Sequence, residues 1–102
     1  MKKNNFIVTS VTTREKLIRQ LILNKPDIIF LDVLVNGEDG RKICLELKQN
    51  KEFKNLPVIL TSLEGDQLKE YRQYLADEYL QKPFDVLTII DKTKLLLNIS
   101  EN

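Results

Sequence analysis

In the stretch IIFLDVLVNGEDG, residues 28–40, a run of large apolar residues is closed by the carboxylate Asp32 and followed by a loop that holds Asn36, Gly37 and Gly40. All of residues 28–31 have branched or aromatic apolar side chains, which is typical of a strand buried on both faces of a parallel sheet. Asp32 follows where this strand meets the loop. Because ligands of open parallel sheets bind outside the carboxyl ends of the strands, Asp32 is a candidate for chemistry. An aspartate here can equally cap the next helix or bind loop amides.

The composition is that of one small, nearly neutral domain. The chain has 102 residues, which predicts a single domain over residues 1–102. Sixteen Lys and Arg against 15 Asp and Glu leave a net charge of +1, which does not indicate a nucleic-acid partner. No apolar run approaches the roughly 20 residues that span a bilayer, and the start, MKKNNF, lacks the apolar stretch of a signal peptide. We therefore expect a cytosolic protein that binds neither nucleic acid nor membrane.

Two residue counts narrow the possible chemistry. The chain contains no histidine, which excludes Ser/His and Cys/His catalysis and histidine-based metal sites. Its one cysteine, Cys44, lies inside a helical pattern. A single cysteine forms no internal disulfide, and without a nearby base it is not expected to be a catalytic thiol.

Strand-like and helix-like segments alternate along the chain. Hydrophobic periodicity predicts strands over residues 6–10, 28–32, 58–62 and 79–81, and helices over residues 13–23, 39–50, 66–76 and 86–98. These are about four βα units in succession. Such a series predicts an α/β fold with a parallel sheet, right-handed crossovers and helices on both faces.

Three polar features follow three of the predicted strands: Asp32, then Thr61 with Ser62, then Lys82 before Pro83. Taken singly, each has an ordinary explanation as a loop or surface residue. Because the carboxyl ends of parallel strands meet at one edge of a sheet, we expect the three to converge. A carboxylate, a hydroxyl and an ammonium group there would provide a nucleophile, a hydrogen-bond donor and a counter-charge for a phosphoryl group.

The runs PDIIFLDVLVNGEDG, LPVILTS and ADEYLQKPFD closely resemble the receiver domain of bacterial two-component response regulators. This resemblance implies a flavodoxin-like (CheY-like) fold. By position, Asp32 matches the aspartate that accepts the phosphoryl group and Ser62 matches the switch serine or threonine. Lys82 matches the invariant lysine, whose bond to the following proline is usually cis in the family. Tyr79 matches the aromatic residue that moves inward on activation.

The chain departs from the family in two places. Asn36 stands where the family usually has proline. Residues 6–27 resemble the family's second strand and second helix, so we expect the first strand, its acidic pair and the first helix to be absent. That pair normally holds Mg²⁺. The resemblance then implies only a weak Mg²⁺ site, made by Asp32 and the backbone carbonyl of Leu34, and we expect Lys82 to pair with Asp32 in the unphosphorylated protein.

Three functions are compatible with these features. The first is a phosphorelay receiver that takes a phosphoryl group on Asp32 from a histidine kinase or phosphotransfer protein. The second is a receiver-like interaction module that no longer takes phosphate. The expected absence of the acidic pair favours this module. The presence of Asp32, Ser62 and Lys82 together argues against it. The third, an aspartyl phosphatase of the haloacid dehalogenase type, would require a second Asp where Leu34 stands. We expect the first function, a phosphorelay receiver, and we expect no enzymatic activity.

The first predicted strand raises a question of packing. Loss of the family's central first strand would leave strand edges exposed. We expect residues 6–10 to lie beside residues 28–32 in the same chain. The alternative is a homodimer in which a second chain completes the sheet.

Overall fold

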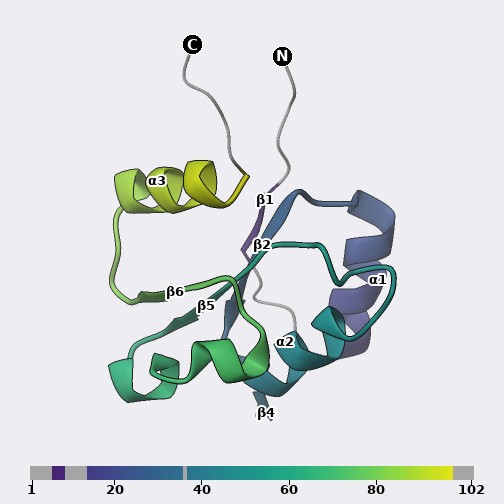
Figure 1. Cartoon of the computed structure of the whole chain (residues 1–102), viewed down its shortest axis with the longest axis horizontal. Coiled ribbons are helices and arrows are strands. Elements are labelled where there is room, and N and C mark those ends of the chain that lie inside the picture. Colours follow the sequence, from purple (N-terminus) through teal and green to yellow (C-terminus); the bar gives the residue numbers. More distant parts are fainter. Residues whose placement is uncertain (1–5, 9–13, 36, 98–102) are drawn as a thin grey trace.

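A four-stranded parallel sheet forms the centre of the molecule (Figure 1). The computed structural model describes residues 6–8, 14–35 and 37–97. The strands lie in the order β1 (Phe6–Val8), β2 (Ile28–Asp32), β5 (Val58–Ser62) and β6 (Glu78–Gln81). A two-stranded antiparallel hairpin, β3 (Leu34–Val35) with β4 (Glu38–Asp39), follows β2 and was not predicted. The predicted α/β architecture with a parallel sheet is confirmed.

Helices cover both faces of this sheet, but unequally. One face carries α1 (Arg14–Asn24), α2 (Gly40–Lys48) and the 3₁₀ turns η1 (Gly65–Leu68) and η2 (Tyr71–Tyr74). The other face carries only α3 (Val86–Leu97) (Figure 1). The larger core cluster lies under α1 and α2, and a smaller one, centred on Ile28, Phe30 and Ile59, lies under α3.

β1 pairs directly with β2 in its own chain, with Phe6, Ile7 and Val8 in register with Ile28, Ile29 and Phe30. This confirms the expected pairing for residues 6–8, while residues 9 and 10 of the predicted strand lie outside the described residues. The four strands therefore follow one another across the sheet in chain order. Because each connection moves in the same direction, all three connections pass over the same face, and only α3 crosses to the other.

The predicted helix over residues 66–76 is wrong. The structure has the two short 3₁₀ turns η1 and η2 there, and Leu75 adopts a left-handed backbone with φ of 63°. Contacts with other elements fix this segment near its start, because the side chain of Gln67 binds Ser62 and its carbonyl accepts a hydrogen bond from Arg41 at 3.4 Å. Tertiary contacts here override the helical spacing of the apolar residues.

The other predicted elements agree with the structure to within about two residues at each end. β2 and β5 have the predicted bounds. α2 begins one residue later than predicted because Asp39 serves as its N-cap, accepting a hydrogen bond from the backbone N–H of Arg41 at 2.9 Å, and it ends two residues earlier, with Gln49 as its C-cap. Residues 13 and 98 of the predicted helices lie outside the described part. No helix in the described residues is long and apolar enough to cross a membrane.

Gly40 lets the start of α2 pack directly on the end of β2. A Cβ atom at this position would lie 1.8 Å from the backbone oxygen of Asp32 and 3.1 Å from the Cα atom of Val33. The N–H of Gly40 also donates a hydrogen bond to the carbonyl of Val33. This close contact between backbones fixes where the strand ends, and so fixes the position of Asp32.

The packing at Gly40 predicts a large cost for a single methyl group. Gly40→Ala should lower the free energy of unfolding by about 3 kcal/mol, because the clash is with backbone that cannot move aside. Gly65→Ala is the matched control, since its Cβ would meet only the end of the Gln81 side chain, at 3.0 Å. It should cost less than about 1 kcal/mol. Urea unfolding of both variants measures the difference, and equal costs would contradict the packing described.

Candidate functional site

The three predicted polar features meet at the carboxyl edge of the sheet. Asp32 ends β2, Thr61 and Ser62 end β5, and Lys82 directly follows β6. In the strand register Asp32 lies beside Thr61. All four residues line one pocket of about 290 Å³. The expected convergence is therefore confirmed.

The Asp32 carboxylate has two contacts on the same oxygen. Lys82 Nζ lies 2.9 Å from Asp32 Oδ1, and the Thr61 hydroxyl donates a hydrogen bond to that oxygen. Both side chains of the ion pair are about one-third exposed, at 35% for Lys82 and 34% for Asp32. Among the described residues, no hydrogen bond or ion pair is found on Oδ2 of Asp32. The expected pairing of Lys82 with Asp32 is confirmed.

Ser62 lines the pocket but is bound to a different partner. Its hydroxyl donates a hydrogen bond to Gln67 Oε1 and accepts one from the backbone N–H of Glu64 at 3.1 Å. Thr61 is thus the hydroxyl that contacts the carboxylate. Successive residues of a strand point to opposite faces, so only one of two neighbouring hydroxyls can lie directly against Asp32.

The loop after β5 is held closed by the end of β6. Gln81 Nε2 donates to the carbonyl of Leu63 at 3.2 Å, and the N–H of Lys82 donates to the carbonyl of Ser62 at 2.8 Å. The Lys82–Pro83 bond is cis, as the resemblance implies. Gln67 and Gln81 were not singled out from the sequence, because a glutamine in a loop or at a strand end carries no distinctive pattern.

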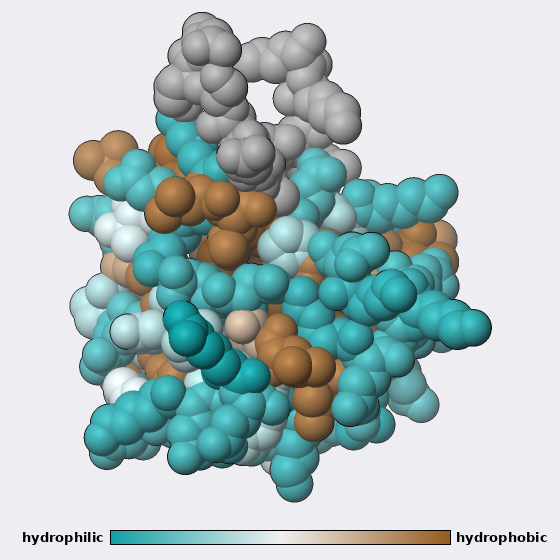
Figure 2. Space-filling view, viewed as in Figure 1, coloured by the Kyte–Doolittle hydropathy of each residue, from teal (hydrophilic) through white to brown (hydrophobic). Residues whose placement is uncertain are grey.

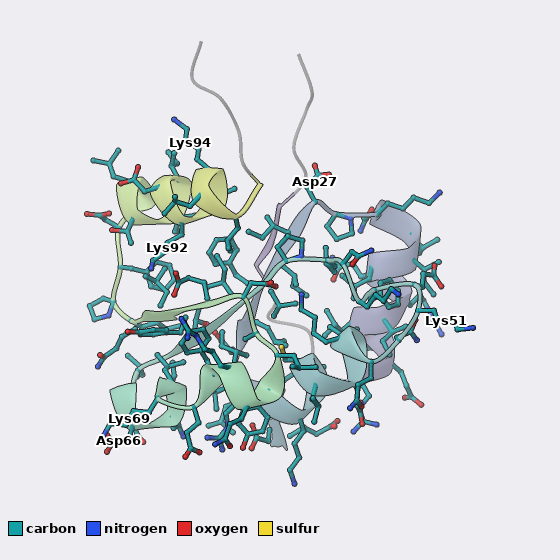
Figure 3. All side chains as sticks on the ribbon, in the orientation of Figure 1. Asp27, Lys51, Asp66, Lys69, Lys92 and Lys94 are labelled. Carbon is teal, nitrogen blue, oxygen red and sulfur yellow. The ribbon has the colours of Figure 1, made fainter. Side chains whose placement is uncertain are left out.

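Tyr79 lies on the outside of the sheet, away from the pocket. Its side chain is 43% exposed, and its ring packs on Tyr71 with the ring centroids 4.9 Å apart. Lys92 Nζ lies 5.9 Å from the Tyr79 ring centroid and 3.2 Å from Glu78. Figure 3 shows Lys92 on the side of α3 that faces β6. In this structure the matched aromatic residue is on the surface.

Few acids are available to hold a cation at this edge. The first 14 positions of the sequence contain no Asp or Glu. Asp39 is paired with Arg41 at 2.8 Å, and this hydrogen-bonded guanidinium holds the pKa of Asp39 below its usual value. Within the described ranges, no three His, Cys, Asp or Glu residues are grouped to bind a metal. Asp32 and Glu64 are the acids that line the pocket, with Leu34 beside them.

Cys44 has no part in this site. Its side chain is fully buried in the larger core cluster, and this burial raises the pKa of the thiol to about 12. A thiol that stays protonated at neutral pH is a poor nucleophile. Cys44 is therefore a core residue.

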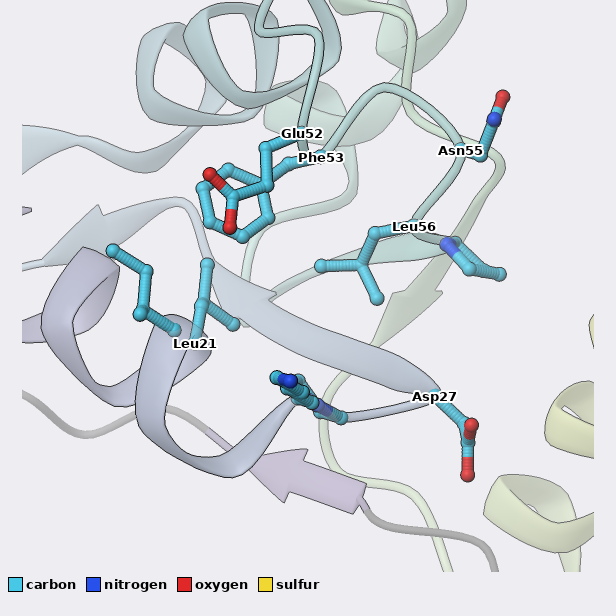
Figure 4. A pocket seen from close by; sticks show the side chains of 10 residues that line it. Leu21, Asp27, Glu52, Phe53, Asn55 and Leu56 are labelled. Atoms are coloured by element: carbon cyan, nitrogen blue, oxygen red, sulfur yellow. The ribbon is translucent and has the colours of Figure 1, made fainter.

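A second hollow, of about 400 Å³, lies beside the end of α1 and the loop that leads into β5 (Figure 4). Leu21, Phe53 and Leu56 form its apolar lining, while Asp27 and Asn55 project away from it. It lies next to the amino ends of β2 and β5, whereas the Asp32 pocket lies at their carboxyl ends. We assign no chemistry to this hollow.

Known proteins resemble this chain in sequence. The phosphate regulon transcriptional regulatory protein PhoB of Rhizobium meliloti is 31% identical over 74 residues, which cover 71% of this chain and 33% of PhoB. The alkaline phosphatase synthesis transcriptional regulatory protein PhoP of Bacillus subtilis is 25% identical over 103 residues, covering 99% of this chain and 42% of PhoP. The matched part of the chain thus spans 33% of one of these curated relatives and 42% of the other.

Solved structures share the fold. A putative response regulator from Chloroflexus aurantiacus superimposes with a TM-score of 0.81 at 20% identity, covering 95% of this chain and 100% of the other. The signal receiver domain of a histidine kinase from Syntrophus aciditrophicus gives a TM-score of 0.79 at 21% identity, covering 98% and 95%. The fold is therefore a shortened flavodoxin-like, or CheY-like, fold. Because the family model of the response regulator receiver domain matches residues 1–94, this chain belongs to the response regulator receiver family of two-component signalling.

Proposed function

We propose that this domain works in a phosphorelay by accepting a phosphoryl group on Asp32 from a histidine kinase or phosphotransfer protein. The observation that carries the proposal is the arrangement around one carboxylate. Lys82 and Thr61 both bind Oδ1 of Asp32, which leaves Oδ2 as the oxygen without a contact among the described residues. A fixed carboxylate with one oxygen available and a cation beside it suits nucleophilic attack on phosphorus.

In the transfer, the Asp32 carboxylate forms a bond to the phosphorus in line with the bond that breaks. When the donor is a phosphohistidine, the phosphorus–nitrogen bond breaks, the imidazole nitrogen keeps the electron pair, and the imidazole takes a proton. The transition state spreads negative charge over three equatorial oxygens. Lys82 would move from the carboxylate to one of those oxygens and balance its charge.

The Ser62 hydroxyl would link phosphoryl transfer to a change in the surface of the protein. In the unphosphorylated structure it is engaged by Gln67. A phosphoryl oxygen is a stronger acceptor than an amide oxygen, so Ser62 would exchange Gln67 for the phosphoryl group and draw the loop after β5 inward. Tyr79, now outside, would then move inward, which makes a two-state switch driven by local electrostatics.

Bound Mg²⁺ would neutralise part of the negative charge at this site. Asp32 and the backbone carbonyl of Leu34 are the groups we expect to hold it. Mg²⁺ is satisfied by one or two carboxylates together with phosphate and water. The pocket fits such an ion only weakly, because Glu64 is the one further acid that lines it. Lys82 would therefore carry most of the positive charge.

The alternative is a receiver-like interaction module that takes no phosphate. The lack of any acid in the first 14 positions favours it, because the family's usual cation ligands have no evident replacement there. Receiver domains are signalling modules rather than classical enzymes. That this domain has no enzymatic activity, is cytosolic and binds no nucleic acid stays a prediction.

Phosphorylation should occur at Asp32 alone. Treatment of the chain with acetyl phosphate should give one phosphoryl adduct by intact mass, and Asp32→Asn should give none, because Asp32 is the carboxylate that Lys82 binds among the described residues. An equal adduct on both proteins would contradict the assignment of Asp32 as the phosphorylated residue. No adduct on either protein, with this donor or with a phosphorylated kinase, would favour the interaction module.

Thr61 offers a matched pair of variants for the same assay. Thr61→Val keeps the shape but removes the hydroxyl, and should slow phosphorylation about tenfold because the carboxylate loses one of its two fixed contacts. Thr61→Ser keeps the hydroxyl and should stay within about threefold of the wild type. Equal rates for all three proteins would show that this hydroxyl does not position Asp32.

Mg²⁺ should bind with a dissociation constant above about 1 mM, because one charge pair at about 4 Å is worth roughly 4 kcal/mol before desolvation and, among the described residues, Asp32 and Glu64 are the acids that line the pocket. Titration followed by amide shifts near Asp32 measures this affinity. Saturation below about millimolar metal would contradict the expectation. Glu64→Gln is the control, since a loss of such tight binding in this variant would identify Glu64 as the substitute ligand.

A further inference from the structure

The hydroxyl of Ser62 is engaged by a neighbouring side chain in this structure. It donates a hydrogen bond to Gln67 Oε1 and accepts one from the backbone N–H of Glu64 at 3.1 Å. A serine hydroxyl has one proton, so Ser62 can donate to only one acceptor at a time. Both Ser62 and Gln67 line the pocket that holds Asp32. A phosphoryl oxygen on Asp32 and the amide oxygen of Gln67 would therefore compete for the same proton.

The segment that carries Gln67 has few local contacts that hold its conformation. η1 and η2 are short 3₁₀ turns, and within the described residues neither has a side-chain hydrogen bond at its N-cap. Of their residues, all in the described part of the chain, Leu68 alone is buried. Figure 2 shows a mostly hydrophilic surface over these turns, which are the green segment at the lower left of Figure 1. Because hydrogen bonds in 3₁₀ turns have poorer geometry than those in α-helices, contacts from other elements determine where Gln67 lies.

Arg41 provides such contacts from the start of α2. Asp39 binds its guanidinium through both carboxylate oxygens, with Nη2 at 2.8 Å from Oδ2 and Nε at 3.0 Å from Oδ1. The remaining nitrogen, Nη1, donates to the carbonyl of Gln67 at 3.4 Å. The guanidinium also lies 5.4 Å from the ring centroid of Tyr74 in η2, within the range of a cation–π contact. Arg41 thus contacts both turns and helps to hold Gln67 beside Ser62.

We propose that the hydrogen bond between Ser62 and Gln67 is an autoinhibitory contact, and that Gln67 is the positioning residue that holds the switch in its resting state. A phosphoryl group on Asp32 has to displace Gln67 before the Ser62 hydroxyl can bind it. The inference rests on the proposed phosphorylation of Asp32, because that phosphoryl group is the competitor. Since a neutral hydrogen bond contributes a modest net free energy, the contact should weaken phosphoryl binding about fivefold.

Two variants measure the contact without any phosphoryl group. Gln67→Met keeps nearly the same shape but removes the amide oxygen, and Ser62→Ala removes the hydroxyl. In a double-mutant cycle of urea unfolding, the two residues should be coupled by a factor of about five in the unfolding equilibrium constant. Additive effects of the two substitutions would show that the contact does not stabilise the resting state. That result would overturn the inference whether or not Asp32 is phosphorylated.

Beryllofluoride tests the competition itself, because this tetrahedral phosphoryl analogue binds a carboxylate oxygen and its fluorine atoms accept hydrogen bonds. Titration in excess Mg²⁺, followed by amide shifts near Asp32, should show about fivefold tighter binding to Gln67→Met than to the wild type. In the Ser62→Ala background, Gln67→Met should have no effect, because Gln67 acts through that hydroxyl. Equal affinities of the wild type and Gln67→Met, or the same gain without the Ser62 hydroxyl, would overturn the inference.

Gln73→Met is the matched control. Gln73 is an exposed glutamine in η2 and is not among the residues that line the Asp32 pocket, so this variant should bind beryllofluoride as the wild type does. Equal gains from Gln67→Met and Gln73→Met would overturn the inference. If neither the wild type nor Gln67→Met binds beryllofluoride, the proposed phosphorylation fails and the inference fails with it. Binding by the wild type that Gln67→Met does not strengthen would reject the autoinhibitory contact alone.

Discussion

The direct pairing of β1 with β2 is the contact on which the rest of the structure depends. It places the four strands in chain order, whereas the usual flavodoxin-like order, 2-1-3-4-5, reverses direction beside the first strand. With no reversal, every connection between strands covers the same face, and α3 covers the other face alone. The site is affected too, because β1, the neighbour of β2 on that side, belongs to a segment without acids.

The Asp32 carboxylate is paired with a cation in this structure. Lys82 binds Asp32 directly. Both partners are about one-third exposed, so water screens their attraction and the pair stabilises the fold by at most about 1 kcal/mol. In the proposed phosphorylation, little free energy would be needed to move Lys82 from the carboxylate to a phosphoryl oxygen. The Ser62 hydroxyl is likewise bound to another side chain in this structure, that of Gln67.

The sequence predicts the parts of the fold that depend on local pattern. β2 and β5 have the predicted bounds because each is a continuous apolar run, the pattern of a strand that is buried on both faces of the sheet. The predicted helix over residues 66–76 is wrong because contacts from Arg41 and Ser62, elsewhere in the sequence, determine the backbone conformation there. Likewise, the convergence of Asp32, Ser62 and Lys82 follows from strand order, but which hydroxyl contacts Asp32 depends on the strand register, and pattern alone does not give it.

The whole sheet depends on β1 lying beside β2 within one chain. Nuclear Overhauser effects between backbone protons of the pairs Phe6–Ile28, Ile7–Ile29 and Val8–Phe30 report this contact directly. Samples that mix differently labelled chains separate contacts within a chain from contacts between chains. We predict that all three pairs give effects within one chain, at concentrations where the protein is monomeric. Effects seen only between chains, or none at these pairs, would contradict the account.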